Sequence, residues 1–425
     1  MRLASLSAVL LVAACGGGSP ATPDGPGPAA AVRVTVTQAG QPVGALTVYF
    51  LEADGTLVST AITDAAGRAS AELHAGGSVT VVHASLPPTA DAYQLDSWVA
   101  VQPGDALALD LPVAAPGVNL QVSAPVASLA GVMSYRVVSP CGASAFFLAG
   151  QRPELSLAPN CLGDARTTDF TVFAQGTDEQ DIAALVAPMI GVPPDTQDLA
   201  LAGDYQPLVD VPIAYAHTGS EQDLTVEVHA VGGGGQTPVA NASFHGTSGS
   251  LGGTFHWPSQ LTTGTRVIES YPGPDTEKEI LSWAPVTSSV ALDLTDQLGQ
   301  DMTSQATIDA AHQQITWTIA DDGVPAQIAI ASMEVMEDAG TYVAWTIVAP
   351  GATPQIALPQ LPRSVISIAN PAQVGVGMVL LRVPGGTVSW TQVLGAGGYR
   401  AGFSGLISAS PSGAISEVFS PAIPL

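Results

Sequence analysis

Alternation of apolar and polar residues runs through most regular segments of this chain, and it limits the possible folds more than any other feature. The alternation is clear in Val32–Val36, Leu224–Val228 and Ile315–Ile319, and clusters of Pro, Gly and Asp separate such segments. A period of two places successive side chains on opposite faces of a sheet, so each segment is typical of a strand with one buried face. The sequence therefore predicts an all-β fold of serial antiparallel β-sandwich domains, Ig-like or transthyretin-like.

One segment departs from this alternation. Residues Glu179–Ile190 form a largely apolar stretch, and they are the one place where a helix fits the pattern. Pro188 weakens that helix, because proline inside a helix removes a hydrogen bond and clashes with the preceding turn. We expect this segment to be an insertion or a short helix that caps a sandwich.

The first fifteen residues carry an export pattern. Arg2 precedes an apolar stretch, and small residues follow it up to Cys15. This is typical of a secretory signal peptide, and the stretch is too short to span a bilayer. Leu11-Val12-Ala13-Ala14-Cys15 resembles the bacterial lipobox. That resemblance implies cleavage of residues 1–14 and acylation of Cys15, whose acyl chains would hold the protein on a membrane.

A linker follows the cysteine. Residues 15–30 consist mostly of Gly, Pro, Ser and Ala, which predicts a flexible tether. Gly16 is not the aspartate that marks inner-membrane retention in enteric lipoproteins, so the resemblance favours the outer membrane or the cell surface.

Charge excludes one class of partner. The chain carries 36 acidic and 11 basic residues, a formal net charge of −25. A protein this acidic, without a basic patch, is a poor partner for nucleic acid or for an anionic membrane surface. The acidic residues are dispersed, and the interpretation we favour is solubility outside the cell.

Two cysteines remain after Cys15. Cys141 and Cys161 form an even number in an exported chain, which predicts a disulfide. Closing that loop is worth about 3 kcal/mol in the chain-entropy description. Their spacing excludes a CxxC metal or redox motif.

The first predicted domain, residues 31–115, carries a further resemblance. Gly40–Phe50 contains a turn followed by a strand, and Thr63–Ala69 contains a turn that enters the next strand. In the second turn Asp64 can bond the backbone two residues on, and Gly67 can supply a position with positive φ. Both stretches are similar to carboxypeptidase regulatory-like domains and to the bacterial Ig-like domains of the invasin type. The resemblance implies a β-sandwich and says little about function. Further β modules are predicted over residues 116–202, 203–292 and 293–425.

The usual catalytic and cofactor motifs are absent. Gly246-Thr247-Ser248-Gly249-Ser250 ends in the wrong residue for a nucleophile elbow, and the sequence contains no HExxH, Walker or Rossmann pattern. We predict no catalytic residue, no cofactor and no metal site. Trp257, Trp317 and Trp345 stand in phase with apolar neighbours, which favours core positions over a sugar-stacking face.

Two histidines suggest one geometric hypothesis. Ala242–His245 and Thr254–Trp257 fit two short strands around a glycine-rich turn. A symmetric hairpin would pair His245 with His256 on one face and Phe244 with Trp257 on the other. Two imidazoles alone make no zinc site, so we expect an exposed polar pair.

These features favour a lipid-anchored envelope or surface protein with a non-enzymatic structural or binding role and an unknown protein or glycan ligand. The alternative is a carbohydrate- or peptide-binding accessory protein of an envelope or secreted machine. A third reading, an enzyme whose carboxylates meet only in the fold, stays open.

Overall fold

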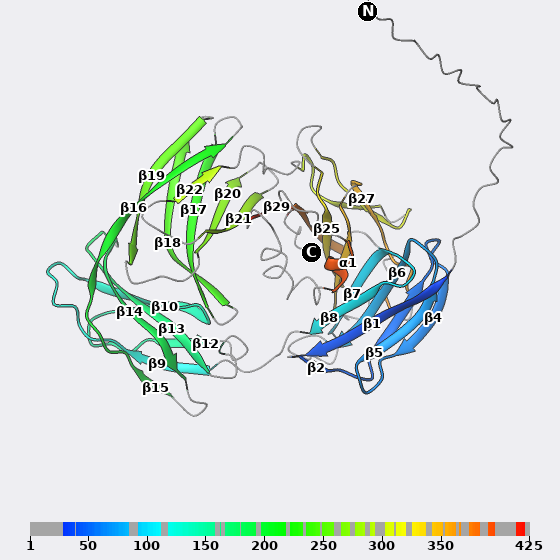
Figure 1. Cartoon of the computed structure of the whole chain (residues 1–425), viewed down its shortest axis with the longest axis horizontal. Coiled ribbons are helices and arrows are strands. Elements are labelled where there is room, and N and C mark those ends of the chain that lie inside the picture. The colour runs from blue at the N-terminus through cyan, green and yellow to red at the C-terminus, as the bar shows by residue number, and fades with distance from the viewer. Residues whose placement is uncertain are drawn as a thin grey trace, which may run out of the picture.

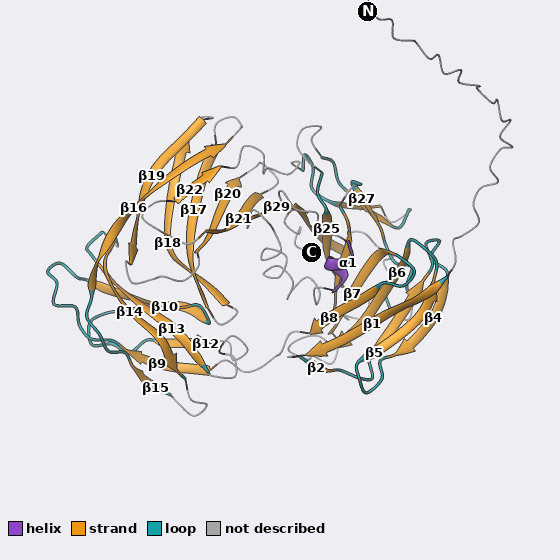
Figure 2. Ribbon diagram, viewed as in Figure 1, coloured by secondary structure: helices purple, strands orange, loops and turns teal. Residues whose placement is uncertain are grey.

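The computed structural model is almost entirely β-sheet, which confirms the all-β prediction. Figure 2 shows strands throughout, and the described residues contain one short helix, α1 (Trp390–Gly395). The structure describes residues 29–38, 40–84, 92–111, 118–157, 162, 166–178, 180–192, 197–217, 222–232, 235–246, 249–258, 265–272, 277–284, 290–293, 302–309, 312–319, 325–336, 342–351, 353–362, 365–366, 374–382, 390–395 and 414–420.

A four-stranded sheet, here the small sheet, forms one wall of the first core. Its strands are β1 (Ala30–Gln38), β2 (Gln41–Pro42), β5 (Arg68–Leu73) and β8 (Ala106–Leu111). The predicted alternation holds in β1, where Val32, Val34 and Val36 are fully buried and the residues between them are not. β8 runs parallel to β1 and adds Leu107 and Leu109 to the same core.

A twelve-stranded sheet, here the long sheet, is the main frame of the molecule (Figure 1). In spatial order its strands are β18 (Gly235–Gly246), β17 (Gln222–Gly232), β20 (Thr265–Pro272), β21 (Glu277–Ala284), β29 (Ala414–Ser420), β28 (Val374–Arg382), β25 (Ile328–Met336), β26 (Tyr342–Pro350), β7 (Ala92–Val101), β6 (Gly77–Ala84), β3 (Thr47–Leu51) and β4 (Leu57–Ile62). β7 and β26 pair in parallel, so strands from the two ends of the sequence share one sheet. The predicted domain boundaries themselves stay predictions.

The long sheet separates two cores. On β7, Trp98 faces the first core and the small sheet, whereas Leu95 faces the second. The second core is closed by a three-stranded sheet of β23 (Thr307–Asp309), β24 (Gln314–Thr316) and β27 (Gln355–Ala357). Trp317 and Trp345 lie in this core at 5% and 1% exposure, which confirms their predicted positions.

A ten-stranded sheet, here the middle sheet, surrounds the third core. Its strands are β15 (Asp198–Ala200), β9 (Val118–Ser123), β12 (Glu154–Leu157), β11 (Gly142–Phe147), β10 (Ser134–Ser139), β13 (Thr167–Gln175), β14 (Asp181–Gly191), β16 (Gln206–His217), β19 (Gly249–Pro258) and β22 (Val290–Asp293). Leu120, Val137, Phe170 and Leu185 are among its buried residues. Figure 1 draws this sheet on the opposite side of the molecule from β1.

The helix expected over Glu179–Ile190 is wrong, because Asp181–Gly191 forms strand β14. Ala183 and Leu185 lie in the third core while Ala184 between them is also buried, so the strand is covered on both faces. A strand buried on both faces loses the alternation and cannot be told from a buried helix by periodicity alone. Pro188 stands in an irregularity of the β13–β14 pairing, where a strand tolerates proline.

The predicted histidine hairpin is also wrong. Both strands exist, but β18 pairs with β17, and β19 pairs with β16 in the middle sheet. His245 therefore lies opposite Asp223, and His256 lies opposite Asp210. The two strands extend to residues 246 and 249, so the segment expected to be a long hairpin loop is mostly strand, and the chain changes sheets there. Trp257 is buried at 3% exposure, as its phase predicted.

Candidate functional site: an exposed edge strand

β4 ends the long sheet. It pairs antiparallel with β3, and no other strand among the described residues pairs with it. A free edge presents a row of backbone N–H and C=O groups to which another strand can bind. The strand therefore offers main-chain hydrogen bonds as well as side chains.

The side chains of β4 are apolar or uncharged and reach the solvent. Leu57, Val58 and Ile62 are 43%, 42% and 66% exposed. Only Ala61 packs on the first core from this strand. Proteins usually protect an edge with charged residues, proline or a bulge that twists it away. The sequence Leu-Val-Ser-Thr-Ala-Ile contains no charge and no proline, and the register of β4 with β3 shifts only at the start of the strand, between Leu57 and Ser59. Its composition is that of a strand open to pairing.

The hydrogen bonds at the end of β4 show which backbone groups point outwards. The Thr63 N–H donates to the Leu46 carbonyl at 2.9 Å, so residue 63 bonds towards β3. Backbone groups alternate in direction along an antiparallel strand. Ser59 and Ala61 therefore bond towards β3, and the N–H and C=O groups of Thr60 and Ile62 point away from it.

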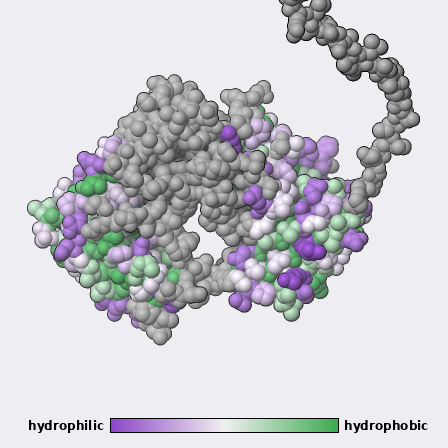
Figure 3. Space-filling view, viewed as in Figure 1, coloured by the Kyte–Doolittle hydropathy of each residue, from purple (hydrophilic) through white to green (hydrophobic). Residues whose placement is uncertain are grey.

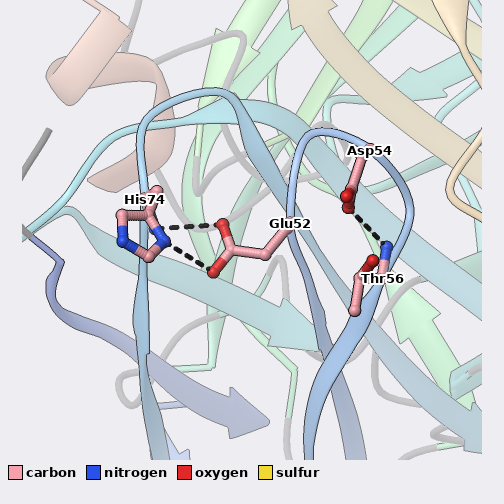
Figure 4. A network of polar contacts seen from close by, with 4 residues as sticks. All are labelled: Glu52, Asp54, Thr56 and His74. Carbon is pink, nitrogen blue, oxygen red and sulfur yellow. Dashed lines mark hydrogen bonds and ion pairs between the residues drawn. The ribbon is translucent and has the colours of Figure 1, made fainter. Parts of the chain in front are cut away.

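The turn before β4 is fixed by side chains (Figure 4). The Asp54 carboxylate accepts a hydrogen bond from the Thr56 N–H at 2.9 Å, and this bond lowers the pKa of Asp54. The Glu52 carboxylate accepts from the His74 N–H at 3.1 Å and lies 2.9 Å from His74 Nδ1. Gly55 has a φ of 83°, a backbone conformation that glycine adopts far more readily than other residues. The hydrogen bonds of Asp54 to Thr56 and of Glu52 to His74 thus hold the start of β4 in place.

The turn after β4 is fixed in the same way. Asp64 Oδ1 accepts from the Ala66 N–H at 2.8 Å and from the Arg68 N–H at 2.9 Å. Gly67 has a φ of 71°, and a Cβ there would meet the Val36 carbonyl at 2.3 Å. These are the roles that the sequence predicted for Asp64 and Gly67. Two braced turns leave β4 preorganised, so a partner would lose little entropy in ordering it.

A second polar cluster lies on the middle sheet, and its groups bond to one another. Arg136 Nη2 donates to Asp181 Oδ2 at 2.7 Å, and Gln175 Nε2 donates to Asp181 Oδ1 at 2.9 Å. The Arg136 guanidinium carbon stands 4.7 Å from the centre of the Phe173 ring. The cluster joins β10, β13 and β14, and its geometry is that of a brace between strands.

A third polar cluster is buried in the long sheet. Ser97 Oγ accepts from Trp345 Nε1 at 2.8 Å and lies 2.6 Å from Thr80 Oγ1, on the second-core face. His83 Nε2 lies 2.7 Å from Asp96 Oδ2. His83 and Asp96 occupy the opposite face, because His83 shares the face of Val81, which lies in the first core, and Asp96 alternates with Ser97. The sheet therefore separates the hydroxyl from the imidazole, and the three side chains form no nucleophile–base pair.

The predicted site residues lie elsewhere. Cys15 is outside the described residues. Cys141 is buried and disulfide-bonded, but Cys161 is outside the described residues, so the pairing of these two cysteines stays a prediction. His256 is exposed, with Nδ1 2.8 Å from Asp210 Oδ1. The side chain of His245 is outside the description.

The described residues contain neither a metal-binding cluster nor a membrane-spanning helix. They hold no group of three or more His, Cys, Asp or Glu side chains placed to bind a metal ion. Within that same part of the chain, no helix has the length and hydropathy needed to cross a membrane.

The sequence reasoning missed β4 as a site. The signal was present, because an uncharged apolar segment stands between the turn residues Asp54 and Asp64. What the sequence could not provide is the position of that strand at the end of the sheet.

Comparison with known proteins gives no family. No family model and no curated protein matches the chain. Among solved structures, the Bacillus anthracis TIE protein is 6% identical with a TM-score of 0.17, covering 62% of this chain and 50% of its own. A Ca²⁺-stabilized adhesin that helps an Antarctic bacterium bind ice is 11% identical with a TM-score of 0.13, covering 85% of this chain and 96% of its own. The chain thus spans half the length of the first protein, and likenesses this weak carry no argument about function.

Proposed function

We propose that this chain is a lipid-anchored protein of the outer membrane or cell surface that binds a partner polypeptide by strand addition at β4. The observation that carries the binding role is the free, uncharged edge with outward backbone groups at Thr60 and Ile62. In strand addition, main-chain hydrogen bonds supply affinity and alternate side chains supply specificity. The role is one of binding and requires no catalytic residue.

The proposed anchor rests on the resemblance of Leu11–Cys15 to a lipobox and on the Gly/Pro-rich tether that follows it. Acyl chains on Cys15 would hold the chain on the membrane. The tether leads into β1, which begins at Ala30. Residues of β1 pack in the first core, and Ala61 of β4 packs against the same core. The tether would therefore enter the same sandwich that carries the binding edge.

Peptide binding is favoured over sugar binding by the position of four of the six tryptophans. Trp98, Trp257, Trp317 and Trp345 are all buried, at 5% exposure or less. A ring buried in a core offers no stacking face to a sugar. The exposed apolar side chains of β4 suit the alternate side chains of an extended peptide instead.

Anchoring and binding can be tested separately in native cells. Cys15→Ala is expected to move the protein from the membrane fraction to the soluble fraction and to abolish acyl labelling. An unlabelled wild type whose Cys15→Ala variant stays on membranes would contradict the anchor.

For binding, a photoreactive residue is placed at Ile62, with one at Met133 as the control. Met133 is 59% exposed but outside β4. We expect adducts from position 62 alone, and we expect Thr60→Pro to abolish them, since proline removes the outward N–H. Equal adducts at both positions, or none at position 62, would contradict strand addition.

A further inference from the structure

We propose that the strand that binds to β4 is an extended segment with an uncharged, β-branched centre and basic residues at both ends. This inference rests on the proposed function and names the chemistry of its partner. It follows from the acidic residues that border β4. The same acidic residues would repel a second copy of this chain, which is the alternative occupant.

Acidic side chains border the edge strand on both sides. Glu52 and Asp54 stand in the turn before β4, and Asp64 stands in the turn after it. Between residues 46 and 76 the chain has these three carboxylates and Glu72 against one basic residue, Arg68. β4 itself is uncharged, so an incoming strand meets an apolar centre with negative ends.

The hydrogen bonds of these carboxylates leave room for a cation. Asp54 uses one oxygen on the Thr56 N–H, and Asp64 uses one oxygen on two backbone N–H groups. Each carboxylate has a second oxygen and further lone pairs. Asp54 is fully exposed, and the bond from Thr56 lowers its pKa, so it is charged at neutral pH. A lysine or arginine beyond the end of the partner strand can therefore approach each turn.

A second copy of the chain is disfavoured by the same charges. If two β4 strands paired antiparallel around Thr60, the turn with Asp54 of one copy would approach the turn with Asp64 of the other. A parallel pair would bring like turns together. Either arrangement places carboxylates side by side, and like charges facing each other destabilise strand pairing. The net charge of −25 adds long-range repulsion between copies.

The exposed side chains of β4 define the centre of the partner. Thr60 and Ile62 project to one face of the sheet edge, while Ser59 and Ala61 project to the other. Ile62 is 66% exposed and Val58 is 42% exposed. A partner with valine, isoleucine or threonine at alternate positions covers these side chains, as cross-strand β-branched pairs do in sheets.

The test uses the full chain in detergent and two end-blocked peptides with the same alternating Val-Thr centre. One peptide carries two lysines at each end, and the other carries two glutamates at each end. Fluorescence anisotropy at low ionic strength is expected to give roughly tenfold tighter binding of the lysine peptide. The difference is expected to shrink at high salt, because exposed charges are screened. Thr60→Pro is expected to remove binding of both peptides.

Each of the other outcomes contradicts the charge inference, strand addition or both. Equal binding of both peptides, lost in Thr60→Pro, would overturn the charge inference and leave strand addition standing. Binding of neither peptide would overturn both. Chemical cross-linking of the chain into a dimer that Thr60→Pro abolishes would assign the edge to a second copy instead. Ile62→Lys is the supporting variant: it is expected to weaken the lysine peptide and to strengthen the glutamate peptide.

Discussion

Apolar side chains reach the solvent in two regions of this protein, and the two regions offer a binding partner different chemical groups. On β4 they accompany backbone groups for which the described part of the chain supplies no strand partner besides β3. On the middle sheet, Phe146 and Leu148 are 66% and 53% exposed. Phe146 pairs with Arg136 of β10, β11 meets β12 at Gly142, and Leu148 follows the end of β11. In Figure 3, green apolar surface is visible where Figure 1 draws β9, β13 and β14. An exposed apolar face offers side chains only, whereas an exposed apolar edge also offers directional hydrogen bonds.

The polar groups of the two regions differ as well. Beside Phe146, Arg136 is bound to Asp181 and stacked on Phe173. Around β4, the carboxylates of Asp54 and Asp64 hold backbone turns and keep unused oxygens. The first arrangement braces β10, β13 and β14 against one another. The second holds a strand that can accept another.

The largest expected difference between the regions concerns two phenylalanines. Phe50 on β3 is fully buried in the first core beneath β4, and Phe146 is exposed. Phe50→Ala is expected to lower the free energy of unfolding by about 3–5 kcal/mol, because it leaves a core cavity. Phe146→Ala is expected to change it by less than about 0.5 kcal/mol. Urea denaturation of the full chain measures both, and similar losses would mean that Phe146 is part of a core.

The next effect separates the two sides of β4 itself. Ser59→Pro removes an N–H that bonds towards β3 and is expected to cost about 1–3 kcal/mol, the range for a hydrogen-bonding group left without its partner. Thr60→Pro removes an N–H that points to solvent, where an edge strand tolerates proline, and is expected to cost less than about 1 kcal/mol. Denaturation of the two variants side by side gives the comparison. A larger loss of stability in Thr60→Pro than in Ser59→Pro would show that the Ser59 N–H, and not the Thr60 N–H, points to solvent.

A smaller effect is expected at the turn that ends β4. Asp64→Ala removes an acceptor for two backbone N–H groups and is expected to cost about 1–2 kcal/mol. Asp64→Asn keeps an oxygen acceptor and is the matched control, with a smaller loss. Thermal unfolding followed by circular dichroism measures both. An unchanged midpoint in Asp64→Ala would show that Gly67 and Thr63 hold the turn without the carboxylate.

The smallest effect concerns Asp54. Folding lowers the pKa of Asp54 below its ordinary 3.8 through the Thr56 N–H. The charged form is thus favoured by folding, so its contribution is present above pH 3.8 and is lost as the pH falls through the lowered value. Asp54→Ala is expected to lower the unfolding midpoint slightly at neutral pH, and less at acid pH. A difference that grows on acidification would contradict this sign.

Local features of this fold were predictable from sequence, and long-range pairings were not. The burial of Val32, Val34 and Val36 follows from a period of two, and the phase of Trp317 and Trp345 with their apolar neighbours gave their core positions. The β7–β26 pairing joins residues far apart in the chain, and nothing in either strand specifies its distant neighbour. β14 was misread because burial on both faces removes the alternation.

The same distinction between local features and long-range pairings applies to the candidate site. The turn roles of Asp64 and Gly67 were readable from residue type, since both act within a few residues of themselves. The exposure of β4 is a property of the sheet order, because the same six residues between two other strands would form an ordinary inner strand. The histidine hairpin failed for a related reason: β18 and β19 follow each other in sequence and belong to different sheets.

Amide hydrogen exchange along β4 tests the central claim most directly. In the full chain alone, the Ser59 and Ala61 amides are expected to be protected by β3, and the Thr60 and Ile62 amides are expected to exchange fast. Addition of the lysine-ended peptide is expected to slow exchange at Thr60 and Ile62 and to leave Ser59 and Ala61 unchanged. Unchanged fast exchange at Thr60 and Ile62 under saturating peptide, or protection of both amides before any peptide is added, would contradict the account.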